Sequence, residues 1–497
     1  MRTIDLRGRV ALTSEELAAA LPRAELGVDA AIARVRPLLQ DIAERGEAAL
    51  AEQAVRFDAV APPQTRVPAD RLRQALADLD PAVRRAMEVS IERTRRVHAA
   101  QVPPDGAVLV APGAVIAQRW IPVRRVGLYA PGGLAVYPSS VIMNVVPAQE
   151  AGVGELALAS PPQKDFGGWP HPTILAAAAL LGVEEVYAAG GVSAIGLFAF
   201  GVPGLARKVD VITGPGNVYV AAAKRLVLGR VGIDAEAGPT EIAIVADATA
   251  NPEFVAADLV SQAEHDPLAA SVLITDSPEL AEAVRAAVAR RARATKHSER
   301  VATALGGRQS GIVLVEDLEQ AVDVANAYAA EHLELQVAGA AAVAERIHSA
   351  GAIFVGPSSP VPLGDYLAGS NHVLPTGGTA RFASALGVAS FLKSVQQIEY
   401  AAEALAEVAP LVEAFAQAED LPAHGESVAA RQDADAVWSP SAPSGPAPAG
   451  AVSPPPGHRA AREDADAVVP AAGREDGRPA ATPSGTGTPG QGLEDGR

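Results

Sequence analysis

Val209-Asp210-Val211-Ile212, followed by Thr213-Gly214-Pro215-Gly216-Asn217 and an apolar stretch over 218–226, is the part of the sequence that decides the fold. A short apolar run that ends in glycine and proline is typical of a buried strand and its turn. The residues after the turn have a helix-forming composition. The stretch therefore predicts one strand–turn–helix unit of an α/β protein.

The same unit recurs on both sides of this stretch. Upstream, strands are predicted at 126–129, 156–159 and 186–189, with helices at 173–181 and 194–200. Downstream, strands are predicted at 242–245, 271–274, 311–315 and 352–355, with helices at 252–264, 278–293 and 317–330. Strands that alternate with helices indicate a mostly parallel sheet. We therefore expect an α/β fold of two tandem Rossmann-like domains, each an incomplete dinucleotide-binding fold.

The flanking segments complete the expected organisation. Residues 1–119 form an N-terminal region with helices over 14–105 and short strands over 107–117, and 120–238 and 239–380 are the two α/β domains. Residues 381–430 are predicted to be a small helical C-terminal piece, with helix over 397–420. The tail 431–497 is rich in proline, alanine and glycine, has few large apolar groups, and is predicted to be disordered.

Composition excludes several classes of function. The formal net charge of −17 disfavours binding to nucleic acid and to anionic membranes. The absence of cysteine excludes disulfides, thiolate catalysis and iron–sulfur clusters, so any metal must be held by His, Asp, Glu, Gln or Asn. Because no apolar run reaches the roughly 20 residues that span a bilayer, and the first residues do not resemble a signal peptide, we expect a cytoplasmic protein.

Four segments carry residues suited to chemistry. Gln262 and His265 are three apart at the end of a predicted helix, which places two possible metal ligands on one face. Glu331-His332 lies at a helix–strand junction, where a carboxylate and an imidazole form a natural acid–base pair. Asp365 and His372 share a Gly-rich polar loop, and His424 precedes the tail. Taken singly, each segment is also compatible with a polar helix end, a solvated pair or a capping histidine.

Taken together, these segments and several others resemble the histidinol dehydrogenase family from about residue 30 to 430. The other landmarks occur in the same order: Gly127–Gly133, Ser160–Gln163, Pro170–Ile174, Thr213–Tyr219, Ala237–Glu241 and Asp365–Gly378. Any one of these matches is weak, but so many in order are specific.

The resemblance implies roles for individual residues. Gln262, His265, Asp365 and His424 match the family's zinc ligands, and the last comes from the partner subunit of a homodimer. Glu331 and His332 match the acid–base pair. Further roles follow the same pattern, with substrate contacts at Thr240, His372 and Glu419 beside the zinc ligands and His332, and NAD contacts at Tyr129, Ser193 and Asn217. Ser193 departs from the family, which commonly has the longer glutamine there, so NAD is expected to bind more weakly or through a water.

The resemblance also implies an activity. The family uses one Zn²⁺ per subunit and NAD⁺ to oxidise L-histidinol through L-histidinaldehyde to L-histidine, the last steps of histidine biosynthesis. Two alternatives remain at this point: a paralogous zinc- and NAD-dependent dehydrogenase of another small polar alcohol, and a metal-dependent hydrolase built on the same donors. A binding protein without enzymatic activity has no need for such clustered ligands.

Overall fold

The computed structural model describes residues 1–9, 12–24, 27–132, 135–236 and 238–432. Almost all of the described chain belongs to one compact unit, Met1–Val428. The predicted tail lies outside the described residues from 433 onward. None of the described helices is long and apolar enough to cross a membrane.

The first α/β domain is built on a five-stranded sheet in the order β6-β5-β4-β7-β8, and every pair is parallel. Its strands are β4 (Arg125–Tyr129), β5 (Glu155–Ser160), β6 (Glu185–Ala188), β7 (Val211–Thr213) and β8 (Gly232–Ile233). Successive side chains of β4 point to opposite faces, so that Val126 and Leu128 enter one apolar core and Tyr129 enters the other.

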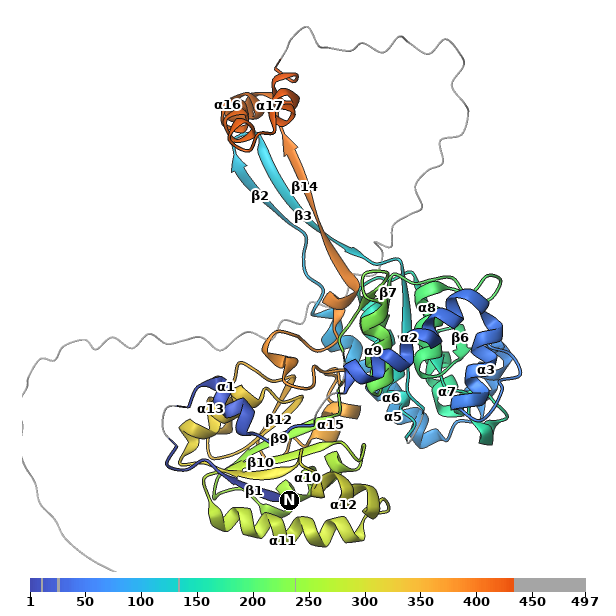
Figure 1. Cartoon of the computed structure of the whole chain (residues 1–497), viewed down its shortest axis with the longest axis vertical. Helices are drawn as coiled ribbons and strands as arrows, with labels where there is room; N and C mark the ends of the chain where they lie inside the picture. The colour runs from blue at the N-terminus through green and yellow to red at the C-terminus, as the bar shows by residue number, and fades with distance from the viewer. Residues whose placement is uncertain (10–11, 25–26, 133–134, 237, 433–497) are drawn as a thin grey trace, which may run out of the picture. The chain divides into compact units, whose positions relative to one another are not determined.

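Helices cover both faces of this sheet (Figure 1). The face of Leu128 packs against α4 (Ala69–Ala77), α5 (Pro81–Ala99), α6 (Pro138–Glu150) and α7 (Pro172–Leu180). The face of Tyr129 packs against α2 (Val28–Arg45), α3 (Glu47–Phe57), α8 (Gly191–Phe200) and α9 (Val218–Val227). Aliphatic side chains dominate both cores, as a composition with 4% aromatic residues requires.

The second α/β domain has a six-stranded parallel sheet in the order β1-β11-β10-β9-β12-β13. Its strands are β1 (Arg2–Asp5), β9 (Glu241–Ala246), β10 (Ala270–Thr275), β11 (Gly311–Leu314), β12 (His332–Gln336) and β13 (Ala352–Val355). One face packs against α1 (Ser14–Ala20), α13 (Leu318–Tyr328) and α14 (Ala340–Ala344). The other packs against α10 (Pro252–Ala263), α11 (Pro278–Ala294) and α12 (Ser298–Gly306).

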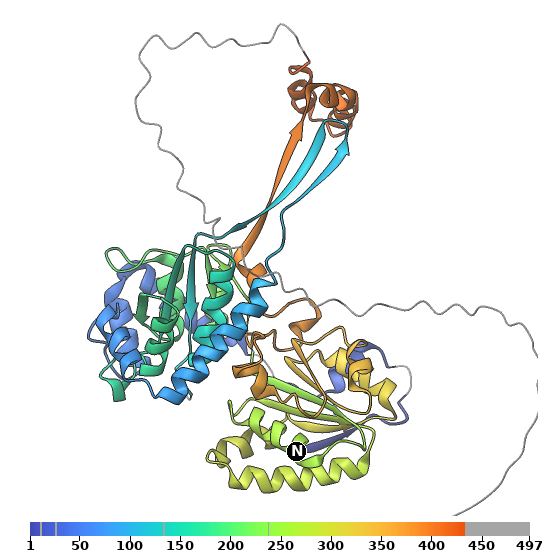
Figure 2. The same cartoon turned by 180° about the vertical axis from the view of Figure 1, so that it is seen from behind.

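The predicted α/β fold with parallel sheets is confirmed, and the two sheets share one winding. In each sheet a starting strand, β4 or β9, has the next two strands along the chain on one side and the following two on the other. One partner was not expected: β1, at the N-terminus, pairs with β11 and forms an edge of the second sheet (Figures 1 and 2).

A third sheet is antiparallel, with β14 (Leu392–Tyr400) and β2 (Gly106–Ala111) on either side of β3 (Ala114–Pro122). The prediction of helix from residue 397 was wrong over 397–400, because those residues continue β14. Their backbone groups pair with β3, which lies nearly 300 residues away in the sequence, so local composition could not reveal them. Helices α16 (Ala402–Ala418) and α17 (Pro422–Ala429) follow at the end of this sheet (Figures 1 and 2).

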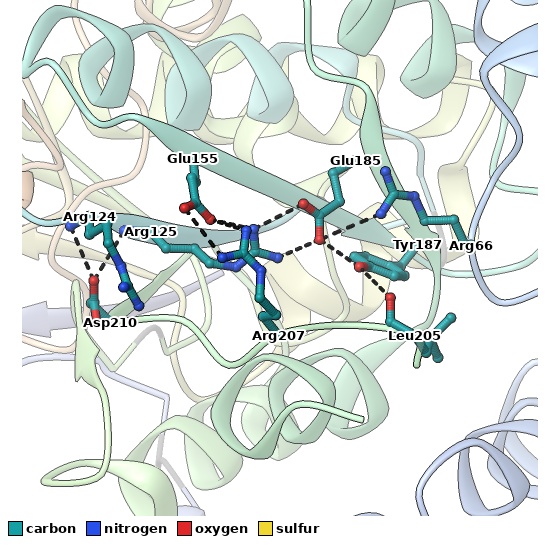
Figure 3. Close-up of polar contacts among 9 residues, drawn as sticks. All are labelled: Arg66, Arg124, Arg125, Glu155, Glu185, Tyr187, Leu205, Arg207 and Asp210. Carbon is teal, nitrogen blue, oxygen red and sulfur yellow. Dashed lines mark hydrogen bonds and ion pairs between the residues drawn. The ribbon is translucent and has the colours of Figure 1, made fainter. Parts of the chain in front are cut away.

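A buried arginine joins three strands of the first sheet at their amino ends (Figure 3). Arg125, Glu155 and Glu185 are the first residues of β4, β5 and β6, so parallel pairing brings them together. Arg125 is 1% exposed and donates from Nη1 to Glu155 at 3.1 Å and to Glu185 at 2.9 Å. The Tyr187 hydroxyl donates to Glu185 at 2.6 Å, and the exposed Arg207 pairs with Glu155.

Replacing Arg125 with methionine should therefore destabilise the domain. Two partly buried carboxylates would lose their shared cation, which costs about 3–5 kcal/mol in unfolding free energy. Arg207→Ala is the matched control, because its side chain is 67% exposed and the loss should be about 0–1 kcal/mol. Thermal unfolding followed by circular dichroism measures both. Equal midpoints for the two variants would contradict a stabilising role for Arg125.

Candidate functional site

Most of the predicted site residues lie at the amino edge of the second sheet. His332 is the first residue of β12, and Glu331 directly precedes it. Thr240 directly precedes β9, the strand beside β12 in the sheet. Parallel pairing of the two strands therefore places these three side chains together. The predicted helix–strand junction at Glu331 and His332 is confirmed.

A directed chain of hydrogen bonds connects α10 to Glu331. Gln262, near the end of α10, donates from Nε2 to Thr240 Oγ1 at 2.6 Å. Thr240 in turn donates its hydroxyl proton to Glu331 Oε2 at 2.6 Å, and the backbone N–H of Glu241 donates to the same oxygen at 2.8 Å. Because the Gln262 amide nitrogen is engaged, its oxygen Oε1 is turned away, and this buried atom has no hydrogen-bond partner among the described residues.

His332 is held as a neutral imidazole with one free nitrogen. Its Nδ1 lies 3.2 Å from the carbonyl oxygen of Glu241, which can only accept, so Nδ1 carries the proton. Nε2 is therefore the unprotonated nitrogen, and it is buried with no hydrogen-bond partner in the described chain. Burial lowers the pKa of His332, which keeps the ring neutral near pH 7. The arrangement can accept a proton at Nε2.

Glu331 shows the opposite effect of burial. Loss of solvation raises the pKa of its carboxyl to about 8, although the bonds from Thr240 and Glu241 lower it and the charge of Asp365 raises it further. A carboxyl with a pKa near the working pH can both give and take a proton. Glu331 and His332 therefore have the properties of an acid–base pair, and Glu331 Oε2 lies 3.6 Å from His332 Nδ1.

Asp365 is the negative charge that the site histidines share. It lies in α15 (Val361–Tyr366), which forms a short helix at the start of the Gly-rich segment. Its charge raises the pKa of His265, His332 and His372, while burial, the larger effect, lowers all three. His372 donates from Nδ1 to the carbonyl oxygen of Asp365 at 3.1 Å.

His265 and His372 also contact the first domain. The His265 ring stacks on Tyr137, which precedes α6, with an interplanar angle of 4°. His372 Nε2 lies 3.1 Å from the hydroxyl of Ser140, a residue of α6. Since Nδ1 of His372 carries the proton, Nε2 accepts from Ser140. These contacts fix the two imidazoles from both domains.

Two predicted residues are not brought to this cluster by the chain itself. Glu419 directly follows α16 and His424 lies in α17, and both side chains are exposed. Among the described residues, no group of three or more His, Asp or Glu side chains is arranged to hold a metal ion. Of the ligands that the family resemblance implies, Gln262, His265 and Asp365 belong to this cluster within one chain.

The three predicted cofactor residues lie at the carboxyl end of the first sheet. Tyr129 ends β4, is buried, and accepts a hydrogen bond at its hydroxyl from the backbone N–H of Gly191 at 3.0 Å. Asn217 caps α9 by accepting from Tyr219 and Val220, and it is exposed. Ser193 lies in the first turn of α8 and donates its hydroxyl to Gln53 at 2.9 Å.

Comparisons with known proteins show to which family the chain is similar. A sequence model of the histidinol dehydrogenase family matches residues 21–432. The chain is 61% identical to histidinol dehydrogenase of Nocardia farcinica, over 87% of this chain and 98% of that protein, and 60% identical to that of Thermobifida fusca, over 86% and 97%.

The chain belongs to the histidinol dehydrogenase family. The protein is therefore an oxidoreductase of histidine biosynthesis. A crystal structure of histidinol dehydrogenase from Elizabethkingia anophelis matches its fold with a TM-score of 0.81 at 32% identity, covering 87% of this chain and 98% of that one.

The sequence of this family member was not enough to identify all residues of the site. Ser140 was missed because a serine in an apolar helix carries no signal of its own. Glu241 was noted only as part of a landmark, yet it is buried 3.4 Å from Arg23, and burial raises its pKa to about 7. A charged residue that opens an otherwise apolar strand was the available signal for Glu241.

Thr240→Val should disconnect Gln262 from Glu331 while keeping the side-chain shape. The Gln262 amide would lose its orienting partner, and loss of such an outer contact lowers metal affinity by about 10–100-fold. Thr240→Ser keeps the hydroxyl and should retain the affinity. Competition for Zn²⁺ against a chelating dye measures both variants, and equal affinities would show that Thr240 does not orient Gln262.

Proposed function

We propose that this enzyme carries out the four-electron oxidation of L-histidinol through L-histidinaldehyde to L-histidine, with NAD⁺ and one Zn²⁺ per subunit. The observation that carries the proposal is the buried His332 with a free Nε2, beside Glu331 and the unpartnered amide oxygen of Gln262. One base for a hydroxyl proton and one carboxylate for water are what the two oxidations require.

The donor set fits zinc. A buried amide oxygen without a donor is unfavourable unless a cation or a proton donor meets it, and Gln262 Oε1 is such an atom. Gln262, His265, Asp365 and His424 are the proposed ligands, with oxygen and nitrogen donors that zinc accepts. When bound, Zn²⁺ supplies a positive charge that holds the substrate in place without taking part in electron transfer.

His332 acts as the base in the first oxidation. Nε2 takes the proton of the alcohol hydroxyl as the carbon releases hydride, and Nδ1 remains bonded to the Glu241 carbonyl. NAD⁺ accepts the hydride in each of the two oxidations. Burial keeps His332 neutral before the step, so the ring is ready to receive the proton.

Glu331 acts on water in the second step. Its ionised carboxylate removes a proton from water as the oxygen attacks the bound aldehyde carbon. The protonated His332 returns its proton to the carbonyl oxygen, which gives a hydrate and leaves His332 neutral again. The hydrate then loses hydride to a second NAD⁺ and its hydroxyl proton to His332. The proton balance requires both groups to return their protons to solvent between turnovers.

Other residues bind rather than react. Thr240, His372 and Glu419 are proposed to contact the substrate beside the zinc ligands. Tyr129, Ser193 and Asn217 are proposed to contact NAD⁺, which fits their place at the carboxyl end of a doubly wound sheet. Because the Ser193 hydroxyl already donates to Gln53, only its oxygen is available as an acceptor.

We place Glu419 and His424 in the site of the partner subunit of a homodimer. Both are exposed in the single chain, and the helices that carry them also expose Leu411 and Phe415, at 64% and 72%. Apolar surface of this kind on a terminal element favours exchange between subunits. The proposed enzyme acts in the cytoplasm, without nucleic-acid or membrane partners.

The first test is the stoichiometry of the reaction. Purified protein should form about two NADH per L-histidinol, lose activity on chelation and regain it with Zn²⁺. If only one NADH forms per molecule of L-histidinol, the protein is a simple alcohol dehydrogenase paralogue whose own substrate is another polar alcohol. No NADH from L-histidinol or other polar alcohols would favour the hydrolase alternative.

Glu331→Gln should separate the two oxidations. The amide still accepts from Thr240 and Glu241, so the local structure is kept, but it cannot take a proton from water. We expect aldehyde oxidation to fall by about 10²–10⁴-fold and alcohol oxidation to fall much less. Single-turnover assays with each substrate measure this, and an equal loss in both would refute the division of roles.

Mixed dimers test the origin of His424. His424→Ala and His265→Ala should each be inactive alone. In a dimer with one subunit of each kind, exchange of α17 would create one site with all ligands intact, so random pairing should restore about a quarter of wild-type activity. Co-expression with differently tagged subunits ensures mixing. Inactive mixed dimers would mean that each chain uses its own His424.

A further inference from the structure

Behind the proposed site, β12 carries a row of polar side chains inside the domain. His332, Glu334 and Gln336 share one face of the strand, and each is buried. Glu334 pairs in register with Ile244 of β9, whose side chain lies in the core beneath α10. The polar row therefore faces α10, where an apolar row is the usual arrangement.

Glu334 meets a second carboxyl across this layer. Asp258 of α10 lies within hydrogen-bonding reach of it. Gln336 donates from Nε2 to Glu334 Oε2 at 3.4 Å, while Glu334 Oε1 has no donor among the described residues. Two ionised carboxylates can only accept, so a hydrogen bond between them needs a proton on one of the two.

The surroundings favour that proton. Burial raises the pKa of both carboxyls, and the charge of Asp258 raises the pKa of Glu334 further. The cation that acts on Asp258 is Arg291, and it is already paired with Glu253 at 2.9 Å. One carboxyl of the pair is therefore protonated and the other is ionised. No free cation is left among the described residues to form an ion pair with them.

The two carboxyls and Val361 each lie close in sequence to a residue of the proposed site, one helical turn away in a helix or two residues away in a strand. Asp258 is four residues, about one helical turn, before Gln262 in α10. Glu334 is two residues after His332 on the same face of β12. The backbone N–H of Val361, which opens α15 four residues before Asp365, lies near enough to Glu334 to lower the pKa of its carboxyl.

We propose that the hydrogen-bonded Asp258–Glu334 pair is a positioning pair that sets the spacing of α10, β12 and α15, and with it the placement of Gln262, His332 and Asp365. The inference rests on the proposed zinc-dependent function, because it concerns groups that would hold the metal and take the proton. Neither carboxyl touches the reacting atoms.

Three variants test the proposal in the full-length dimer. Glu334→Leu removes the link and leaves Asp258 buried without its partner. Glu334→Gln keeps it, because an amide donates to the Asp258 carboxylate and still accepts from Gln336. Ile244→Ala is the matched control, since it opens a cavity on the same face of the sheet at the same register and leaves both carboxyls of the pair in place.

Zinc affinity of the substrate-free protein is measured by chelator competition, together with thermal unfolding, kcat and KM. We expect Glu334→Leu to lose at least about tenfold in zinc affinity and to lose kcat, with Glu334→Gln close to wild type. Ile244→Ala should lower the unfolding midpoint while keeping zinc affinity.

Different results overturn different claims. If Ile244→Ala loses zinc affinity as much as Glu334→Leu at the same midpoint, the pair contributes only to core stability. If Glu334→Gln is as impaired as Glu334→Leu, the hydrogen bond is not what positions the groups. If the wild-type protein binds no zinc, both this inference and the proposed function fail, whereas normal wild-type binding with unaffected variants overturns the inference alone.

Discussion

The hydrogen bonds that converge on Glu331 constrain the rest of the site. Its Oε2 accepts from the Thr240 hydroxyl and from the backbone of Glu241, and Thr240 is itself oriented by Gln262. Because Thr240 donates its proton to Glu331, it can only accept from Gln262. The amide nitrogen of Gln262 must therefore face Thr240, and the amide oxygen must face away from it. The same strand end fixes the proton of His332 on Nδ1. One backbone segment at the start of β9 thus determines which atoms remain free for chemistry.

The position of this segment is unusual for an α/β protein. Ligands of doubly wound sheets are generally found beyond the carboxyl ends of the strands, as Tyr129 and Asn217 are in the first domain. In the second domain Glu331, His332 and Thr240 lie instead at the amino ends of β12 and β9. The second sheet therefore presents the groups proposed for acid–base chemistry on rigid strand ends.

Sequence reasoning succeeded where the signal was local and failed where it depended on pairing. The strand at 209–212 and its glycine turn were predicted because apolar residues and turn residues are adjacent, and β7 follows at Val211–Thr213. The strand β14 was taken in part for helix, and β1 was not seen, because both depend on partners far along the chain. Of the site, Glu331, His332, Gln262 and Asp365 were singled out by their chemistry, but their roles came only from the family resemblance. Taken singly, each remained compatible with a solvated polar group. Glu241 and Ser140 were missed because their importance comes from contacts with Arg23 and His372.

Because His424 is exposed in the single chain, the proposed mechanism makes metal binding depend on dimer formation. In the proposed mechanism each chain by itself offers Gln262, His265 and Asp365 to zinc, which leaves the coordination incomplete. Supplying the last ligand from an exchanged helix means that a monomer binds the metal weakly and the dimer binds it tightly, so metal loading and dimer formation stabilise each other. Burial of the exposed Leu411 and Phe415 at the same contact would add a hydrophobic contribution that does not depend on the metal. In this proposal the acid–base pair is built within one chain, whereas the metal that would hold the substrate beside it depends on two. Activity is then tied to assembly through substrate binding rather than through the proton-transfer groups.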